Sequence, residues 1–200
     1  SYVKFQTFSA ETLSTRTAKK APYQVNTKEK SQFEMLKKLE LKKDVFKDLF
    51  KFSDELKIDF FSTPFDIDSL NFLCDLGMKR IKIPSGEITN GPLLLEASKK
   101  NLPIILSTGM SNLNEIKEAL SIISYGILKL SKKINANVLN DCFNDNIAKK
   151  KIKKRVTLLH CTSSYPCPVS DANIFAAELP DAVNTLPLNS KGDLTFSATV

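Results

Sequence analysis

The stretch KRIKIPSGEITNG, residues 79–91, decides the fold class of this chain. Its first part, IKI at 81–83, alternates apolar and charged side chains, a period that predicts a short buried strand. The following PSGE at 84–87 ends that strand, because proline has no N–H for the ladder and glycine permits a sharp turn. The strand therefore delivers a cation, a hydroxyl and a carboxylate to its carboxyl end: Lys82, Ser85 and Glu87.

These three side chains suit an anionic substrate that also carries hydroxyl groups, since ammonium and hydroxyl groups donate hydrogen bonds and the carboxylate accepts them. A strand followed by a solvated polar turn would give the same local pattern. The single motif does not decide between the two interpretations, and the rest of the chain must.

Four further stretches repeat the design, each running apolar and then ending in polar residues. They are YVKFQTF at 2–8, IDFFSTPF at 58–65, PIILSTGM at 103–110 and RVTLLHCTSSYPCP at 155–168. Polar groups at the carboxyl ends of successive parallel strands are typical of a (β/α)8 barrel. We therefore predict an α/β fold: a partial TIM barrel of about five parallel strands with helices.

Helices are predicted between these strands from apolar spacing and capping residues. The predicted spans are 31–40, 44–57 with Asp44 as N-cap, 66–76 opened by Asp66 and closed by Gly77, 91–100, and one opened by Asn112 and Glu115 as a capping box. Residues 9–30 read as a long loop. Residues 125–154 read as an extended helix end plus an Asn- and Lys-rich insertion, with the basic run 149–155 as a solvated loop. We place a barrel domain at 1–176 and an irregular tail at 177–200.

Composition excludes several other classes. The 200 residues are 42% hydrophobic, enough for one domain with a core, and no apolar run reaches the roughly 20 residues of a membrane span. The net charge of +7 is compatible with a nucleic-acid-binding protein. Two observations argue against this class: most lysines fall on helix faces, and the basic run has no interleaved aromatic residues. The four cysteines form no CxxC pair, which argues against a zinc ribbon or a thioredoxin site. We expect reduced thiols, a cytoplasmic location, and no nucleic-acid or membrane partner.

Together, the strand-end motifs resemble the sialic acid (N-acetylneuraminate) synthase family. The matching stretches, in collinear order across residues 1–176, are VKFQTF (3–8), FFSTPFD (60–66), IKIPSGEITN (81–90), PIILSTGM (103–110) and LLHCTSSYPCP (158–168). The resemblance implies that the five strands are the second to sixth of a (β/α)8 barrel. It also implies a following antifreeze-like domain, to which nothing in this sequence corresponds.

The resemblance further implies a transferase of carbohydrate biosynthesis that condenses phosphoenolpyruvate with N-acetylmannosamine or a related hexose and releases phosphate. A divalent metal, Mn²⁺ or Mg²⁺, assists in the family, and the enzyme is a homodimer. Two alternatives stay open. The chain could serve a synthase for legionaminic or another nonulosonic acid, or it could be a catalytically inactive fragment that at most binds a phosphate.

Residue by residue, the family pattern assigns Lys82 and Glu87 to catalysis. It assigns substrate binding to Lys4, Gln6, Thr63, Ser85, Ser107, Tyr165 and Asn26. Within that set the lysines hold phosphoenolpyruvate, the serines and Thr63 are its hydroxyl partners, and Gln6, Glu87, Tyr165 and Asn26 lie near the sugar. We expect the phosphoenolpyruvate group to converge at the carboxyl ends of the strands.

The sequence also departs from the family. It has no EAGxNHxG-like first strand and no SDH motif, so the family's metal ligands are missing from this chain. His160 is the only histidine; its position is not a metal ligand in the family, and we expect it to hydrogen-bond near the core. We therefore expect a segment of a barrel, truncated at both ends, that has no measurable synthase activity on its own.

Overall fold

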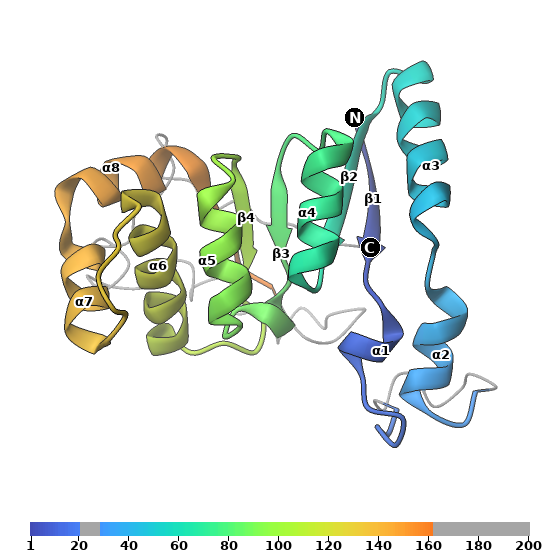
Figure 1. The fold of residues 1–200 in the computed structure, drawn as a ribbon, viewed down its shortest axis with the longest axis horizontal. Coiled ribbons are helices and arrows are strands. Elements are labelled where there is room, and N and C mark those ends of the chain that lie inside the picture. Colours follow the sequence, from blue (N-terminus) through green and yellow to red (C-terminus); the bar gives the residue numbers. More distant parts are fainter. Residues whose placement is uncertain (21–28, 162–200) are drawn as a thin grey trace. The chain divides into compact units, whose positions relative to one another are not determined.

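A computed structural model describes residues 1–20 and 29–161, and they form an α/β structure of parallel strands and helices (Figure 1). The chain divides into two compact units, the first spanning Ser1–Met78 and the second beginning at Lys79. No helix in the described ranges is both long and apolar enough to cross a membrane. The predicted tail at 177–200 lies outside the described residues.

The first unit places two parallel strands against helices. Its elements are β1 (Tyr2–Thr7), α1 (Ala10–Leu13), α2 (Gln32–Leu39), α3 (Lys43–Glu55), β2 (Asp59–Pro64) and α4 (Ile67–Leu76). In the register of the two strands, Lys4 lies opposite Phe61 and Gln6 lies opposite Thr63. Both α3 and α4 contact β2.

Phenylalanines hold this unit together. Phe5 of β1 stacks on Phe60 of β2 with ring centroids 5.3 Å apart. From α3, Phe46 meets Phe5 edge-on at 6.5 Å, and Phe50 meets Phe60 at 5.5 Å. Phe46 and Phe50 are four residues apart and so share one helix face, which explains why α3 packs over both strands.

Both predicted ends of α4 are confirmed. The Asp66 side chain caps the helix by accepting a hydrogen bond from the Ser69 backbone N–H at 2.6 Å. Gly77 closes the helix in the left-handed conformation, with φ of 104°.

Gly77→Ala is expected to destabilise the first unit by about 1–2 kcal/mol, since a Cβ is disfavoured in the left-handed region. The new Cβ would also lie 3.3 Å from the Phe50 ring. Urea unfolding followed by circular dichroism measures the loss. Gly77→Asn is the control, because asparagine tolerates this conformation better; an equal loss in both variants would contradict the backbone explanation.

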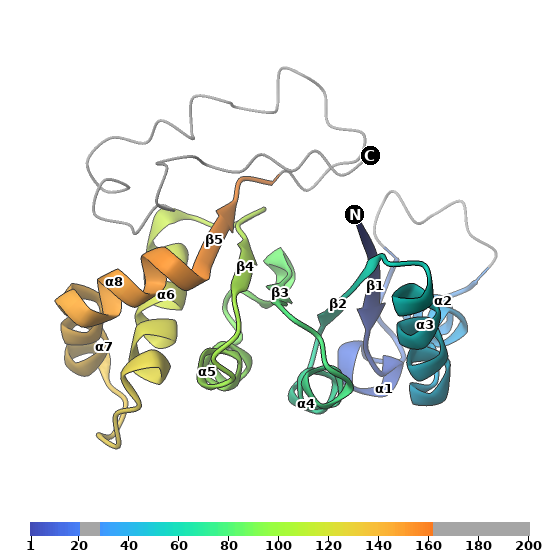
Figure 2. The same ribbon diagram turned by 90° about the horizontal axis from the view of Figure 1, so that it is seen from above.

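The second unit is a three-stranded parallel sheet with helices. Its elements are β3 (Ile81–Ile83), the 3-10 helix η2 (Ser85–Glu87), α5 (Gly91–Lys99), β4 (Ile104–Ser107), α6 (Leu113–Leu128), α7 (Ala136–Asn144), α8 (Asn146–Arg155) and β5 (Val156–Leu159). The strand order is β3-β4-β5, and both pairs are parallel. Helices α5 and α6 lie on one face of this sheet (Figure 2). The predicted capping box at the start of α6 is confirmed.

The predicted parallel strands in sequence order are confirmed within each unit, as β1-β2 in the first and β3-β4-β5 in the second.

The interpretation of the basic run as a solvated loop is wrong, because residues 146–155 form α8. Lysine and arginine are good helix formers, so the composition did not oppose a helix. Asp145 caps the helix by accepting from the Ala148 N–H at 2.8 Å, and Ala148 and Ile152, one turn apart, are both buried.

Two smaller expectations also need correction. The N-cap of α3 is Lys42, whereas Asp44 lies in the first turn and pairs with Lys47 at 2.9 Å. The predicted long loop at 9–30 contains the short helix α1.

Candidate active site at the carboxyl ends of β3, β4 and β5

A lysine and a serine meet at the end of the second unit's sheet. Lys82 Nζ donates a hydrogen bond to Ser107 Oγ at 2.6 Å. Lys82 pairs with Ile105 in the register of β3 and β4, so Ser107, two residues further on, lies on the same face toward the carboxyl end. The flanking Ile81 and Ile83 are fully buried, which leaves Lys82 half-buried on the opposite face.

This contact sets the direction of the serine proton. Ser107 is 2% exposed, and its oxygen accepts from the ammonium group of Lys82. The serine's own O–H must therefore point elsewhere and can donate to another acceptor. An ammonium and an oriented hydroxyl together make a cationic, donor-rich strand end, which suits an anion.

Three strand-end segments converge at Gly109, two residues past β4. A Cβ on Gly109 would lie 3.4 Å from Ser85 Oγ, which follows β3, and 3.3 Å from the Cβ of Cys161, which follows β5. The hydroxyl of Ser85, as predicted, is thus at the same end of the sheet as Ser107. A glycine keeps this approach open, a constraint that the TGM sequence alone did not reveal.

Thr108 fixes the loop after β4 to the end of β5. Its backbone N–H and its Oγ1 both donate to Leu159 O, at 3.1 and 2.9 Å. Sequence reasoning missed this role, because it depends on which carbonyl the neighbouring strand presents.

Glu87 is held by Asn90. Asn90 Nδ2 donates to Glu87 Oε2 at 2.7 Å, while Asn90 Oδ1 accepts from the Leu93 N–H at 3.1 Å and so caps α5. One amide therefore orients the predicted catalytic carboxylate and starts the helix behind it. The contact of Asn90 with Glu87 was not predicted from the sequence, although an Asn before the Gly-Pro that opens α5 was a signal for the helix cap.

Asn90→Ser and Asn90→Ala should separate the two roles. Serine keeps a capping oxygen but lacks the amide donor, whereas alanine loses both, at a cost of about 1 kcal/mol for the cap. We expect the melting temperature to fall in the alanine variant and to change little in the serine variant. Equal melting temperatures for the two variants would contradict the capping role.

The first unit carries the remaining predicted residues that the structure describes. Lys4 and Gln6 are exposed on β1, and Thr63 is buried on β2 directly opposite Gln6. Next to them, Thr7 Oγ1 and Ser62 Oγ share a buried hydrogen bond of 2.7 Å. Asn26 and Tyr165 lie outside the described residues.

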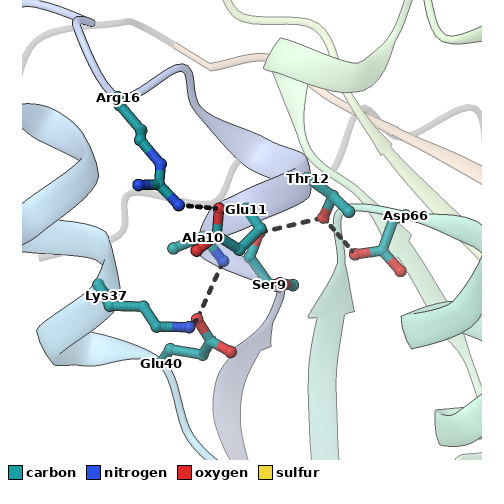
Figure 3. A network of polar contacts seen from close by, with 8 residues as sticks. All are labelled: Ser9, Ala10, Glu11, Thr12, Arg16, Lys37, Glu40 and Asp66. Carbon is teal, nitrogen blue, oxygen red and sulfur yellow. Dashed lines mark hydrogen bonds and ion pairs between the residues drawn. The ribbon is translucent and has the colours of Figure 1, made fainter.

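A polar network holds helix α1, at the start of the segment that was predicted to be a loop (Figure 3). Glu40, the C-cap of α2, accepts from the Ala10 N–H at the start of α1 at 3.1 Å and from Lys37 Nζ at 3.1 Å. On the other side, Thr12 Oγ1 contacts Asp66 Oδ2 at 3.4 Å. Helix α1 is thus joined to α2 and to the start of α4.

The Ala10 N–H, and to a smaller extent Lys37, hold the pKa of Glu40 below its ordinary value, although partial burial opposes this. A lowered folded-state pKa means that the ionised carboxylate stabilises the fold above the unfolded pKa, about 4.3. The contribution is lost as pH falls through the lower, folded pKa.

Glu40→Gln should therefore reduce the free energy of unfolding at pH 7, by less than about 1 kcal/mol, because water still screens this partly buried carboxylate. The difference from the wild type should shrink as the pH falls through the lowered, folded-state pKa of Glu40. Chemical unfolding at pH 7 and at a series of acidic pH values measures it, with Glu118→Gln on α6 as an exposed control that should show no such change. A loss that persists at low pH would show that the charge of Glu40 is not the cause.

A metal ion needs several histidine, cysteine or carboxylate side chains close together. Within residues 1–20 and 29–161, no group of three histidine, cysteine, aspartate or glutamate side chains lies close enough to hold a metal ion. Cys74, Cys142 and Cys161 are free thiols, and burial raises the pKa of Cys142. His160 is half-buried after β5. The described residues therefore do not fit a metal centre.

Comparison with known proteins identifies the family of this chain. The profile of the NeuB family matches residues 1–183. The chain belongs to the NeuB family. This confirms the resemblance to sialic acid synthases that the strand-end motifs carried.

NeuB-family relatives are similar along most of this chain. The N,N'-diacetyllegionaminic acid synthase of Campylobacter jejuni is 44% identical over 184 residues, which cover 90% of this chain and 48% of the relative. That of Legionella pneumophila is 43% identical, over 88% of this chain and 44% of the relative. The crystal structure of the N-acetylneuraminic acid synthetase from Leptospira borgpetersenii, in complex with citrate, superposes with a TM-score of 0.63 at 32% identity, covering 88% of this chain and 49% of that one. The chain thus spans about half the length of these NeuB relatives.

Proposed function

We propose that this chain carries the phosphoenolpyruvate-binding strand ends of a nonulosonic acid synthase. Such an enzyme condenses phosphoenolpyruvate with an N-acetylated hexose and releases phosphate. The observation that carries the proposal is the hydrogen bond between Lys82 and Ser107 at the end of the β3-β4-β5 sheet of a NeuB-family chain. A half-buried ammonium paired with a buried hydroxyl at strand ends suits a small, highly charged anion.

The proposed roles follow from the chemistry of the side chains. Lys82 neutralises the carboxylate or phosphate of phosphoenolpyruvate, and Ser107 donates its remaining proton to the same anion. In the reaction, the enol carbon of phosphoenolpyruvate forms a bond to the aldehyde carbon of the sugar. Water then adds to the resulting cationic carbon, and the C–O bond to phosphate breaks. Glu87, oriented by Asn90, accepts hydrogen bonds from sugar hydroxyls or takes a proton.

The other family-pattern residues complete the proposal. By their match to the family, Ser85 and Thr63 are hydroxyl donors to phosphoenolpyruvate, and Lys4 is a second ammonium that holds it. Gln6, Asn26 and Tyr165 are assigned to the sugar in the same way. A divalent metal, Mn²⁺ or Mg²⁺, would supply Lewis-acid chemistry in such an enzyme, and the described residues offer no group of side chains to hold it. The homodimer expected from the family is also part of the proposal.

For the sugar, the comparisons favour the diacetylated alternative over N-acetylmannosamine. The two relatives above 40% identity are both N,N'-diacetyllegionaminic acid synthases. The N-acetylneuraminate-9-phosphate synthases of fly, mouse and human are 28–30% identical. A competition assay separates the two sugar alternatives. An N,N'-diacetylated hexose should compete more strongly for the sugar site than N-acetylmannosamine does.

Titration of the isotope-labelled chain with phosphoenolpyruvate tests the site itself. We expect saturable shifts in the amide signals of the β3, β4 and β5 carboxyl ends, from Lys82, Ser107 and Gly109. Signals from α7, which lies on the outside of α6, serve as the internal control. Absence of saturable shifts at the strand ends would overturn the proposal.

A further inference from the structure

The opposite end of the same sheet holds a polar cavity of about 280 Å³. It lies beside the carboxyl ends of α5, α6 and α8, the helices whose final turns flank the amino ends of β4 and β5 (Figure 1). From Ile104 to Ser107, β4 spans roughly 10 Å at 3.3 Å per residue, so this cavity is distinct from the Lys82–Ser107 site.

The cavity's charged lining is entirely cationic. It includes Lys99 from α5, Lys129 at the C-cap of α6, and Lys151 and Arg155 from α8, with no carboxylate among the lining residues. Lys99 is paired with Glu96 at 3.3 Å. Within the described ranges, neither Lys129 nor Lys151 forms an ion pair with a carboxylate. Three helix carboxyl ends contribute about half a negative charge each, which offsets only part of four positive charges.

The floor of the cavity is built by close packing. Gly126 of α6 faces Ser98 of α5 so closely that a Cβ on the glycine would overlap the serine oxygen. Arg155 reaches across and donates through Nη2 to Ser98 O and to Leu102 O, both at 3.1 Å. These two bonds hold the guanidinium in one place at the cavity wall.

Arg155 is only partly satisfied by these contacts. Its Nε is buried and has no hydrogen-bond partner in the part of the chain that the structure describes. Burial lowers the pKa of the Arg155 guanidinium, because a desolvated cation is disfavoured. An anion in the cavity would offset that cost.

We propose that this cavity binds the phosphoryl group of a small molecule. Cations reach it from three helices and so from different directions, which matches the tetrahedral oxygens of a phosphoryl group better than a planar carboxylate. Lysine ammonium groups bind phosphate as mobile point charges, and a fixed guanidinium adds direction. The inference rests on α5, α6 and α8 alone and does not depend on the proposed synthase activity.

The test uses the 200-residue chain with Lys82→Met, which removes the strand-end cation from the comparison. Inorganic phosphate and pyrophosphate are titrated separately, and amide signals from residues 98–101 and 126–129 are followed. We expect saturable shifts there with at least one probe. Tighter binding of phosphate identifies a monophosphoryl ligand, and tighter binding of pyrophosphate identifies a diphosphate.

Two double variants then separate a site from general surface charge. Lys129→Gln with Lys151→Gln removes two cavity cations, and we expect about tenfold weaker binding or more, since 1.4 kcal/mol already gives a factor of ten. Lys150→Gln with Lys153→Gln removes the same charge from exposed positions beside the cavity residues of α8 and should change affinity less than about twofold. Equal weakening in both pairs, or no saturable shift with either probe, overturns the proposal. Circular dichroism checks that both double variants stay folded.

Discussion

Lys82→Met is expected to weaken phosphoenolpyruvate binding by about 100-fold, the largest binding effect of any substitution at the strand ends. Hydrogen bonds to charged groups contribute roughly 1.5–3 kcal/mol each, and loss of about 3 kcal/mol corresponds to a factor of about 100. Methionine keeps the length of the side chain, so the half-buried position beside Ile81 and Ile83 stays filled. Isothermal titration calorimetry with phosphoenolpyruvate measures the change.

Two further variants make this result specific. Ser107→Ala removes the hydroxyl that accepts from Lys82 and should have a smaller effect, roughly tenfold. Lys150→Met removes an exposed lysine of α8 and should leave the affinity unchanged. An unaltered affinity in Lys82→Met, with the fold intact, would remove Lys82 from the proposed site.

Gly126→Ala is expected to be the most destabilising of the conservative changes, by about 1–3 kcal/mol. The added methyl would lie 1.7 Å from Ser98 Oγ and 2.9 Å from Ser98 Cβ. The serine oxygen can rotate away, but its Cβ moves only with α5, so the two helices must separate. Thermal and urea unfolding of the second unit report the loss.

The same substitution at Gly86 is the matched control, because a Cβ there would meet nothing within 4 Å. We expect Gly86→Ala to melt within about a degree or two of the wild type, as surface substitutions usually stay within about 0.5 kcal/mol. Adding Ser98→Gly to Gly126→Ala should restore part of the lost stability, since the new methyl then occupies the vacated space. No recovery in the double variant would argue that the glycine acts through its backbone instead.

Local signals predicted much of this fold. The alternation in IKI, the cap at Asp66, the left-handed Gly77 and the capping box of α6 each depend on residues within a few positions of one another. Helix α8 was missed because its stabilising contacts are not local: Ile152 is buried only once other parts of the second unit cover it.

The candidate site also has some features that could be predicted from the sequence and others that could not. Lys82 and Ser107 could be predicted as neighbours because carboxyl ends of adjacent parallel strands meet at one edge. The double role of Asn90 could not, since it requires the 3-10 turn that brings Glu87 back within 2.7 Å. The cavity between α5, α6 and α8 was equally hidden, because its cations come from three separate helices that meet only through packing.

The junction between α8 and β5 limits how this protein can vary in length. The helix ends at Arg155 and the strand begins at Val156, with no loop between them. One residue inserted there would shift the register of β5, exchange its two faces and move Leu159 O away from Thr108. The exposed stretch 131–135, between α6 and α7, has no such restriction. Related chains should therefore differ in length before α7 and keep the α8–β5 junction free of insertions.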